Sequence, residues 1–168
     1  MDWGRALAAA FGMTDDVWRR HASPWSVWTR IPLIGLLALT AWSRVWIGAW
    51  ALVPFAVLLV WTWLNPRFFP PPRSTRNWAS KGVLGERVWL ARDLHPIPDH
   101  HRRVVMILSG FSLLGLPLLI WGLYALEIWP TVFGLAVIVL FKLWFVDRMV
   151  WLYEDMKDQV PEYKSWLY

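Results

Sequence analysis

The sequence predicts an all-α membrane protein whose four transmembrane helices form two helical hairpins joined by a basic, proline-rich cytoplasmic connector. Three observations predict this fold. The 168 residues are 57% hydrophobic, with a mean hydropathy of +0.37, which is too apolar for a soluble domain of this size. Apolar runs approach about twenty residues, the length of a membrane span. Residues 65–103 hold eight of the seventeen Lys and Arg residues but three of the twelve acids, and so carry a net charge of +5.

The composition excludes several classes of function. The chain has no cysteine, which removes disulfides, thiolate nucleophiles and Cys-ligated metal centres. The isoelectric point near 10.0 reflects positive charge next to apolar segments. That placement favours anionic lipid headgroups as the partner, and we expect no nucleic acid partner.

We expect one polytopic membrane domain, which begins with an interfacial segment at residues 1–23. Trp3, Leu7 and Phe11 share one face at helical spacing. Thr14, followed by two acids, predicts the capped start of a second short helix. No cleaved signal peptide is predicted, because the apolar run here is too short.

The first hairpin is expected at residues 24–64. Pro24 after Ser23 predicts a helix start, and this helix should run to about Trp42. Arg30 lies two turns inside it and can extend to the interface, with a re-entrant segment as the alternative reading. A tight turn at Ser43–Arg44 should lead into a full span, Val45–Leu64, bent by Pro54.

The connector is expected at residues 65–103. Asn65–Pro66 should end the second span, and Pro70–Pro72 should be extended. Val83–His95 has the pattern of an amphipathic helix on the membrane surface, with Leu84 and Val88 on its apolar face. The basic residues expected to contact lipid headgroups are Arg67, Arg73, Arg76, Lys81, Arg87, Arg92, Arg102 and Arg103.

The second hairpin is expected at residues 104–147, followed by a cytoplasmic tail at 148–168. Its helices should be Val104–Leu126 and Thr131–Val146, with the second continuing toward Lys157. Since the start of one helix lies level with the end of the other, we predict an ion pair between Asp147 and Arg102 or Arg103, or otherwise another connector arginine. Small residues at helical spacing should allow close helix packing. They are Gly35, Ala38, Ser112, Gly115 and Gly122.

Charge predicts the orientation in the inner (plasma) membrane. Fifteen Lys and Arg residues lie in or beside the N-terminal segment, connector and tail, whereas the opposite side has Arg44 alone, with Lys142 inside the fourth span. The positive-inside rule therefore places both termini and the connector in the cytoplasm. Many of the sixteen tryptophans fall at the expected interfaces, as aromatic belts do.

The connector also holds the candidates for chemistry. His95, His100 and His101 could ligate zinc or iron, and their spacing resembles one histidine box of membrane desaturases. Those enzymes need several boxes, and four histidines cannot supply them. We therefore expect no metal or cofactor, and histidines that do not converge. The candidate catalytic residues are Glu86, Asp93, His95, Asp99, His100 and His101.

The pattern of two hairpins, with Asn65–Pro66, Lys81–Arg87 and Trp89–Leu90 between them, resembles an uncharacterised family of small prokaryotic four-helix membrane proteins. The resemblance implies a fold and no activity.

Three hypotheses for function follow. The first is a non-enzymatic accessory subunit of a larger membrane complex, or a small homo-oligomer. The second is a membrane-surface enzyme acting on an apolar or lipid substrate with Glu86, Asp93 and the residues His95–His101. The third is an oligomeric channel or carrier.

Overall fold

A computed structural model describes residues 11–168, and within that range the chain is helical with no strand. The predicted apolar face at Trp3 and Leu7 lies outside the described residues. In chain order the elements are α2 (Asp15–His21), α3 (Pro24–Arg30), α4 (Leu33–Trp42), α5 (Arg44–Ile47), the 3-10 helix η1 (Gly48–Ala51), α6 (Leu52–Phe68), α7 (Trp78–Leu90), α8 (Asp99–Ala125), α9 (Ile128–Met156) and α10 (Pro161–Ser165).

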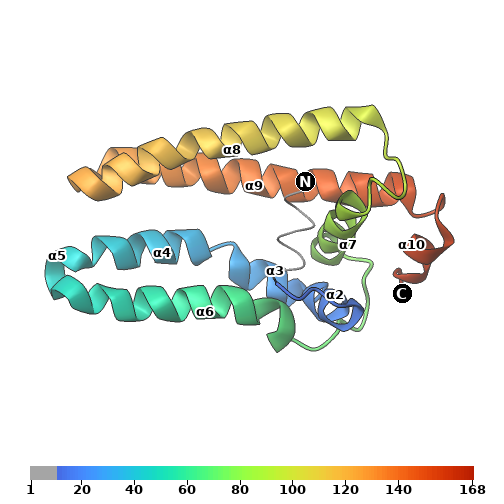
Figure 1. Cartoon of the computed structure of the whole chain (residues 1–168), viewed down its shortest axis with the longest axis horizontal. Helices are drawn as coiled ribbons and strands as arrows, with labels where there is room; N and C mark the ends of the chain where they lie inside the picture. The colour runs from blue at the N-terminus through green and yellow to red at the C-terminus, as the bar shows by residue number, and fades with distance from the viewer. Residues whose placement is uncertain (1–10) are drawn as a thin grey trace.

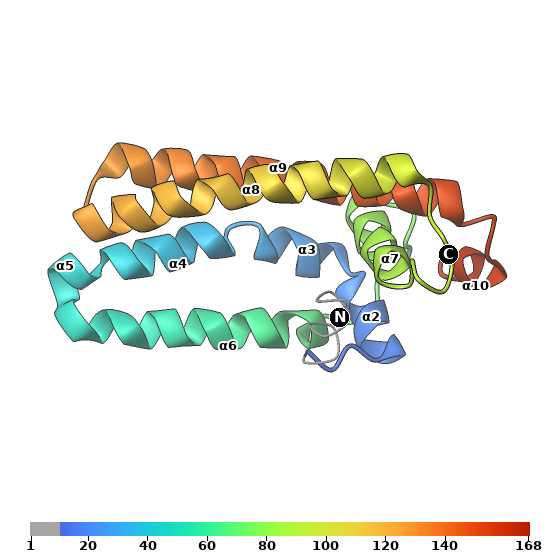
Figure 2. The same ribbon diagram turned by 45° about the horizontal axis from the view of Figure 1, so that its top comes forward.

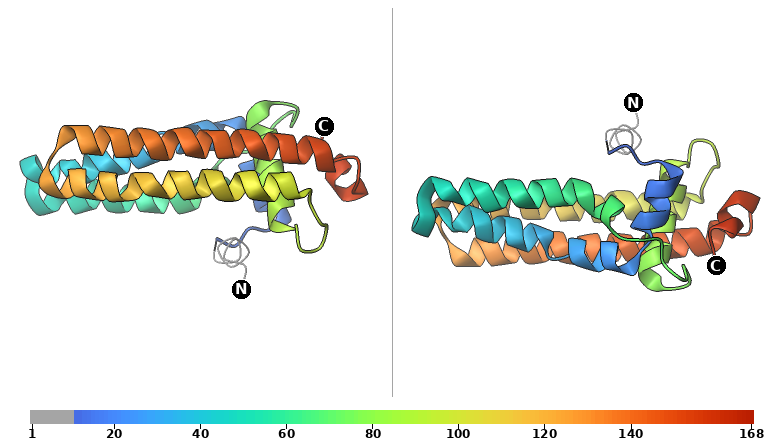
Figure 3. Two further views of the ribbon diagram at one scale, coloured as in Figure 1. Left: turned by 90° about the horizontal axis from the view of Figure 1, so that it is seen from above. Right: turned by 90° about the horizontal axis from the view of Figure 1, so that it is seen from below.

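The long helices form two antiparallel pairs, as the sequence predicts. Figures 1 and 2 show α8 beside α9, with the α4 and α6 pair facing them. The short helices α2, α7 and α10 gather at one end of the molecule, and α5 and the α8–α9 turn lie at the other. Figure 3 shows α7 crossing the α8–α9 pair at a steep angle.

Within residues 11–168, three helical stretches are long and apolar enough to cross a membrane: Pro24–Phe68, Asp99–Ala125 and Ile128–Met156. The first of them, 45 residues long, folds back on itself between α4 and α6. Its outgoing arm was predicted as one helix, but it is broken into α3 and α4 at Ile31–Pro32. Pro32 has no N–H to donate to the preceding turn, which explains the break.

The return arm differs from its predicted bounds. The turn extends through α5 and η1, with Gly48 at φ 57°, so α6 begins at Leu52 rather than Val45. Pro54 therefore falls in the first turn, where a missing N–H costs nothing, and the predicted bend there is wrong. The helix continues past Pro66 to Phe68 instead of ending at Asn65–Pro66.

Small residues bring α8 and α9 together, which confirms their predicted role. A Cβ at Gly115 would lie 2.6 Å from the Gly134 carbonyl oxygen, and one at Gly122 would overlap the backbone of Thr131. The two hairpins meet through α4, where Ala38 is buried in a cluster with Leu119 and Ile138.

These contacts fix the register of α8 against α9 and overturn the predicted ion pair of Asp147. With Gly122 opposite Thr131, the first turn of α8 falls beside Asp155, two turns beyond Asp147. Asp147 instead accepts a hydrogen bond from Trp78 Nε1 at 2.9 Å. Among the described residues, no Lys, Arg or His lies within 4.0 Å of its carboxylate.

The connector helix α7 begins five residues earlier than predicted, at Trp78, where the Asn77 side chain accepts from the Ser80 N–H. Leu84 and Val88 face inward as predicted, but they are buried against α9 in a cluster with Leu152 and Tyr153. The apolar face that the sequence assigned to the membrane surface is therefore part of the protein core.

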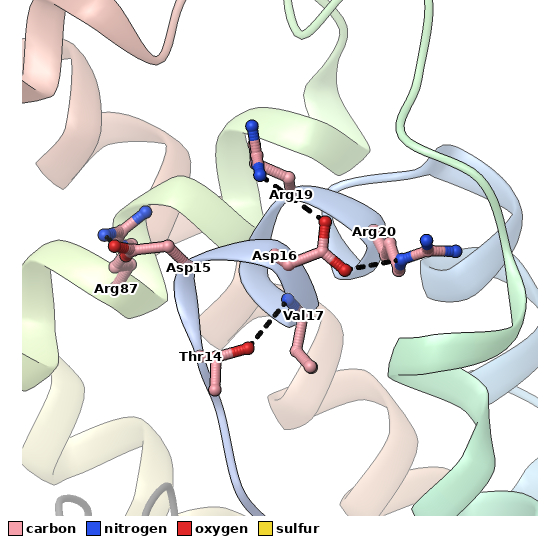
Figure 4. Close-up of polar contacts among 7 residues, drawn as sticks. All are labelled: Thr14, Asp15, Asp16, Val17, Arg19, Arg20 and Arg87. Atoms are coloured by element: carbon pink, nitrogen blue, oxygen red, sulfur yellow. Dashed lines mark hydrogen bonds and ion pairs between the residues drawn. The ribbon is translucent and has the colours of Figure 1, made fainter.

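The start of α2 confirms its sequence signal. Thr14 Oγ1 accepts a hydrogen bond from the Val17 N–H, and Asp16 pairs with Arg20 (Figure 4). Asp15 binds the Arg87 guanidinium of α7, so α2 is joined to the connector.

Candidate functional site

A cavity of about 460 Å³ lies between the two hairpins at the end where α7 crosses them. Its walls are mostly apolar, with Leu33 and Leu37 from α4 and Val139 and Leu143 from α9. Four ionisable side chains also line it: His21, Arg30, Glu86 and Lys142. An apolar chamber with a few polar groups has the character of a small-molecule site, and this volume falls within the usual range of about 300–1,000 Å³.

Glu86 and Lys142 form an ion pair across the cavity. Lys142 Nζ on α9 lies 3.2 Å from Glu86 Oε1 on α7. Burial raises the pKa of the Glu86 carboxyl, but the Lys142 ammonium and the Arg30 guanidinium outweigh it and hold the pKa below its usual value. Glu86 is therefore a carboxylate at neutral pH.

His21 and Arg30 form a second contact in the cavity wall. Arg30 Nη1 lies 2.9 Å from His21 Nε2, and a guanidinium can only donate, so Nε2 accepts. The imidazole is then neutral, with its proton on Nδ1. Burial, together with the Arg30 charge, lowers the pKa of His21 to about 4, in agreement with this assignment.

A chain of hydrogen bonds holds His21 in place. His21 Nδ1 donates to Ser26 Oγ at 2.8 Å, and Ser26 Oγ donates to Asn65 Oδ1 at 2.7 Å. Asn65 Nδ2 donates to Thr29 Oγ1 at 2.9 Å. His21, Ser26 and Asn65 are almost wholly buried. Their bonds connect α2, α3 and α6.

The four ionisable groups leave the cavity with one net positive charge. Arg30 and Lys142 are cations, Glu86 is an anion and His21 is neutral. Glu86 pairs with Lys142, whereas the only polar contact of Arg30 within residues 11–168 is the uncharged imidazole. The Arg30 guanidinium therefore retains its capacity to bind an anion through charge-assisted hydrogen bonds.

Of the candidate catalytic residues predicted from the sequence, Glu86 alone lines this cavity, together with His21, which the sequence suggested as a possible neighbour of the histidine segment. His95 packs edge-on against Tyr163, with ring centroids 5.6 Å apart. Asp99 is the first residue of α8, and Asp93 lies in the turn after α7.

The expectation that the histidines fail to converge is wrong for two of them. The rings of His100 and His101 lie 4.2 Å apart, and both approach Asp155, an acid that the sequence analysis did not single out. His95 remains apart from this group.

The predicted headgroup contacts divide into two sets. Arg67, Lys81, Arg87 and Arg92 make contacts within the protein. For example, Lys81 pairs with Glu154 at 2.5 Å, and Arg87 lies 4.1 Å above the Trp166 ring. The other four arginines are exposed, and for them lipid contact remains a prediction. They are Arg73, Arg76, Arg102 and Arg103.

Sequence reasoning missed His21, Ser26, Arg30 and Asn65 as one unit. Asn65 looked like a helix terminator because proline follows it, and Arg30 looked like a residue reaching for the interface. The available signal was the polar side of α3, where Ser26, Thr29 and Arg30 interrupt an otherwise apolar segment.

The fold and the cavity define an all-helical protein with membrane-length apolar helices and a partly charged chamber between its two hairpins. Comparison with known families agrees with the resemblance seen in the sequence. The chain belongs to the Family of unknown function (DUF6653), whose model matches residues 4–165. No curated protein and no solved structure matches the chain.

Proposed function

We propose that this is a non-enzymatic inner-membrane protein that crosses the bilayer four times and binds an amphipathic anion between its two hairpins. Both termini and the connector lie in the cytoplasm. The ligand is a single-chain lipid with a carboxylate or phosphate headgroup. The accessory or oligomer-forming role expected from the sequence would then depend on that ligand.

Element lengths support four crossings. A straight helix over the 45 residues of Pro24–Phe68 would measure about 68 Å, roughly twice the ~30 Å hydrocarbon core. Because this stretch folds back between α4 and α6, each arm has about the length of one crossing. The 17 residues of α6 alone measure about 26 Å.

The observation that carries the ligand proposal is Arg30. This guanidinium is half-buried in the wall of an apolar cavity, and among residues 11–168 its hydrogen-bond partner is a neutral imidazole. The Glu86 carboxylate in the same cavity also interacts with Arg30 electrostatically, but it is already paired with Lys142. A buried cation is costly unless an anion pairs with it. A carboxylate or phosphate placed against Arg30 would supply that anion, and its alkyl chain would lie along Leu33, Leu37 and Leu143.

Photolabelling tests this proposal. The full chain is reconstituted into phosphatidylcholine nanodiscs with a diazirine analogue of palmitate, irradiated, and mapped by peptide mass spectrometry. We expect labels on cavity residues such as Leu37 and Leu143, displaced by excess palmitate but not by hexadecanol. Arg30→Gln should weaken labelling by about tenfold or more, because a charge-assisted hydrogen bond is lost.

Arg76→Gln is the matched control, since Arg76 is an exposed connector arginine away from the cavity, and it should label like the unmodified chain. Equal displacement by palmitate and hexadecanol, together with undiminished labelling of Arg30→Gln, would contradict the proposal.

The enzyme alternative has less support. It requires Glu86, Asp93 and the residues His95–His101 in one site, whereas Glu86 faces the cavity and His100 and His101 face Asp155.

A further inference from the structure

We propose a second site, independent of the cavity: a divalent transition-metal site formed by His100, His101 and Asp155. The two histidines lie in the first turn of α8, and Asp155 lies near the end of α9. Each residue offers one ligand atom, and these atoms all lie within 4.8 Å of one another.

The distances suit a single ion. Two ligands about 2.0–2.2 Å from a tetrahedral zinc lie about 3.3–3.6 Å from each other. Asp155 Oδ2 is 2.8 Å from His101 Nε2 and 3.9 Å from His100 Nε2, so the two observed separations fall on either side of that range. The ligand atoms of His100 and His101 lie within 4.8 Å of each other, so the exposed His100 and Asp155 side chains would have to rotate to bring all three ligand atoms to one centre.

The chemistry of the ligand set favours a first-row ion such as Zn²⁺. Two imidazoles and one carboxylate are common ligands of zinc and ferrous iron. Without an ion, Asp155 is within hydrogen-bond distance of His101 only, because 3.9 Å is too long for a hydrogen bond to His100. One cation would engage both rings and the carboxylate together.

Burial gives the site a fixed side and an open side. The His101 side chain is only 1% exposed, so α8 and α9 hold its ring in place. The side chains of His100 and Asp155 are 60% and 46% exposed, so an ion can enter from solvent and keep water as a fourth ligand. A bound ion would cross-link the start of α8 to the end of α9.

The test uses the full chain, purified through a tag without histidine and dialysed against EDTA. Isothermal titration with ZnCl₂ should give one zinc per chain, and CoCl₂ should produce the visible absorption of four-coordinate cobalt. Asp155→Asn and His100→Ala should each weaken binding by about tenfold or more, since each removes a ligand. Zinc should also raise the melting temperature of the unmodified chain but not of Asp155→Asn.

His95→Ala is the control, because His95 is a connector histidine that packs on Tyr163 outside the cluster, and it should bind zinc normally. Both ligand variants change exposed side chains, and an unchanged circular dichroism spectrum would show that they remain folded. Absence of zinc binding, or binding that survives both ligand variants, would overturn the proposal. So would an equal loss of binding in His95→Ala.

Discussion

His21 illustrates how one buried side chain sets the character of the cavity. Its neutral imidazole accepts from Arg30 and donates to Ser26, so it orients the guanidinium without cancelling its charge. A carboxylate in the same place would neutralise Arg30 and remove its affinity for an anion. The cavity therefore depends on the protonation state of His21 as well as on its position.

The lowered pKa of His21 predicts how stability depends on pH. The unfolded chain takes up the imidazole proton near the ordinary pKa of about 6.5, whereas the folded chain resists it down to about 4. Stability is thus fully present above about pH 6.5 and falls as the pH drops toward 4, by up to about 3 kcal/mol. Thermal unfolding in detergent, followed across this range, measures the effect.

His21→Gln should flatten the pH profile between pH 4 and 6.5, since it removes the titrating group. His95→Gln changes a histidine outside this hydrogen-bond chain and should leave that part of the profile intact. A profile that is the same in the His21→Gln variant would place the pH dependence elsewhere.

Only part of this site was predictable from the sequence. Glu86 was identified as a carboxylate that could lie near the connector histidines. The contact between Ser26 and Asn65 joins residues 39 positions apart, and it exists only because α3 and α6 cross there. The approach of Asp155 to His101 likewise follows from the register of α8 against α9, which depends on glycine contacts that no local pattern specifies.

At the scale of elements, long apolar helices were predictable and their interruptions were not. Hydropathy predicted the apolar parts of α8 and α9, and α9 extends past Val146 as expected. The two helices begin five and three residues earlier than predicted, at Asp99 and Ile128. The first arm is broken at Pro32, which has no N–H to donate and stands between α3 and α4. The α7 helix was predicted as interfacial because its apolar face matches that of a surface helix, but that face packs on α9.

The absence of a side chain at Gly85 allows α7 to pack closely on α9. A Cβ there would overlap the carbonyl carbon and oxygen of Met149, which are backbone atoms and cannot move aside. Gly85→Ala should therefore destabilise the protein by about 1–3 kcal/mol and lower its melting temperature. The loss should be visible in thermal unfolding followed by tryptophan fluorescence.

Gly110→Ala is the matched control, since it is also a helical glycine but a Cβ there meets no atom within 4 Å. It should be neutral or slightly stabilising, because alanine favours helix by about 1 kcal/mol over glycine. If the two variants melt together, the contact between α7 and α9 is looser than the structure describes.

At the scale of the whole molecule, the end that holds α2, α7 and α10 contains a large cluster of buried apolar side chains. There Tyr153 and Tyr163 are buried, and Tyr153 Oη donates to the Tyr163 carbonyl at 3.0 Å. Along the rest of the long helices, large apolar side chains such as Val57, Leu113 and Leu140 are exposed. A soluble protein would bury such residues, whereas a bilayer solvates them.

The number of crossings decides the topology, and it can be tested directly. If Pro24–Phe68 crossed the membrane once, three crossings would put the two ends of the chain on opposite sides. If it crosses out and back, four crossings put Trp78 and Tyr168 on the same side.

Reporter fusions after Trp78 and at Tyr168 should both report cytoplasm, because the basic residues gather at that end. Fusions at Gly48 and Glu127 should both report the exterior. Trp78 and Tyr168 on opposite sides would rule out four crossings, and a cytoplasmic Gly48 would make the first hairpin re-entrant.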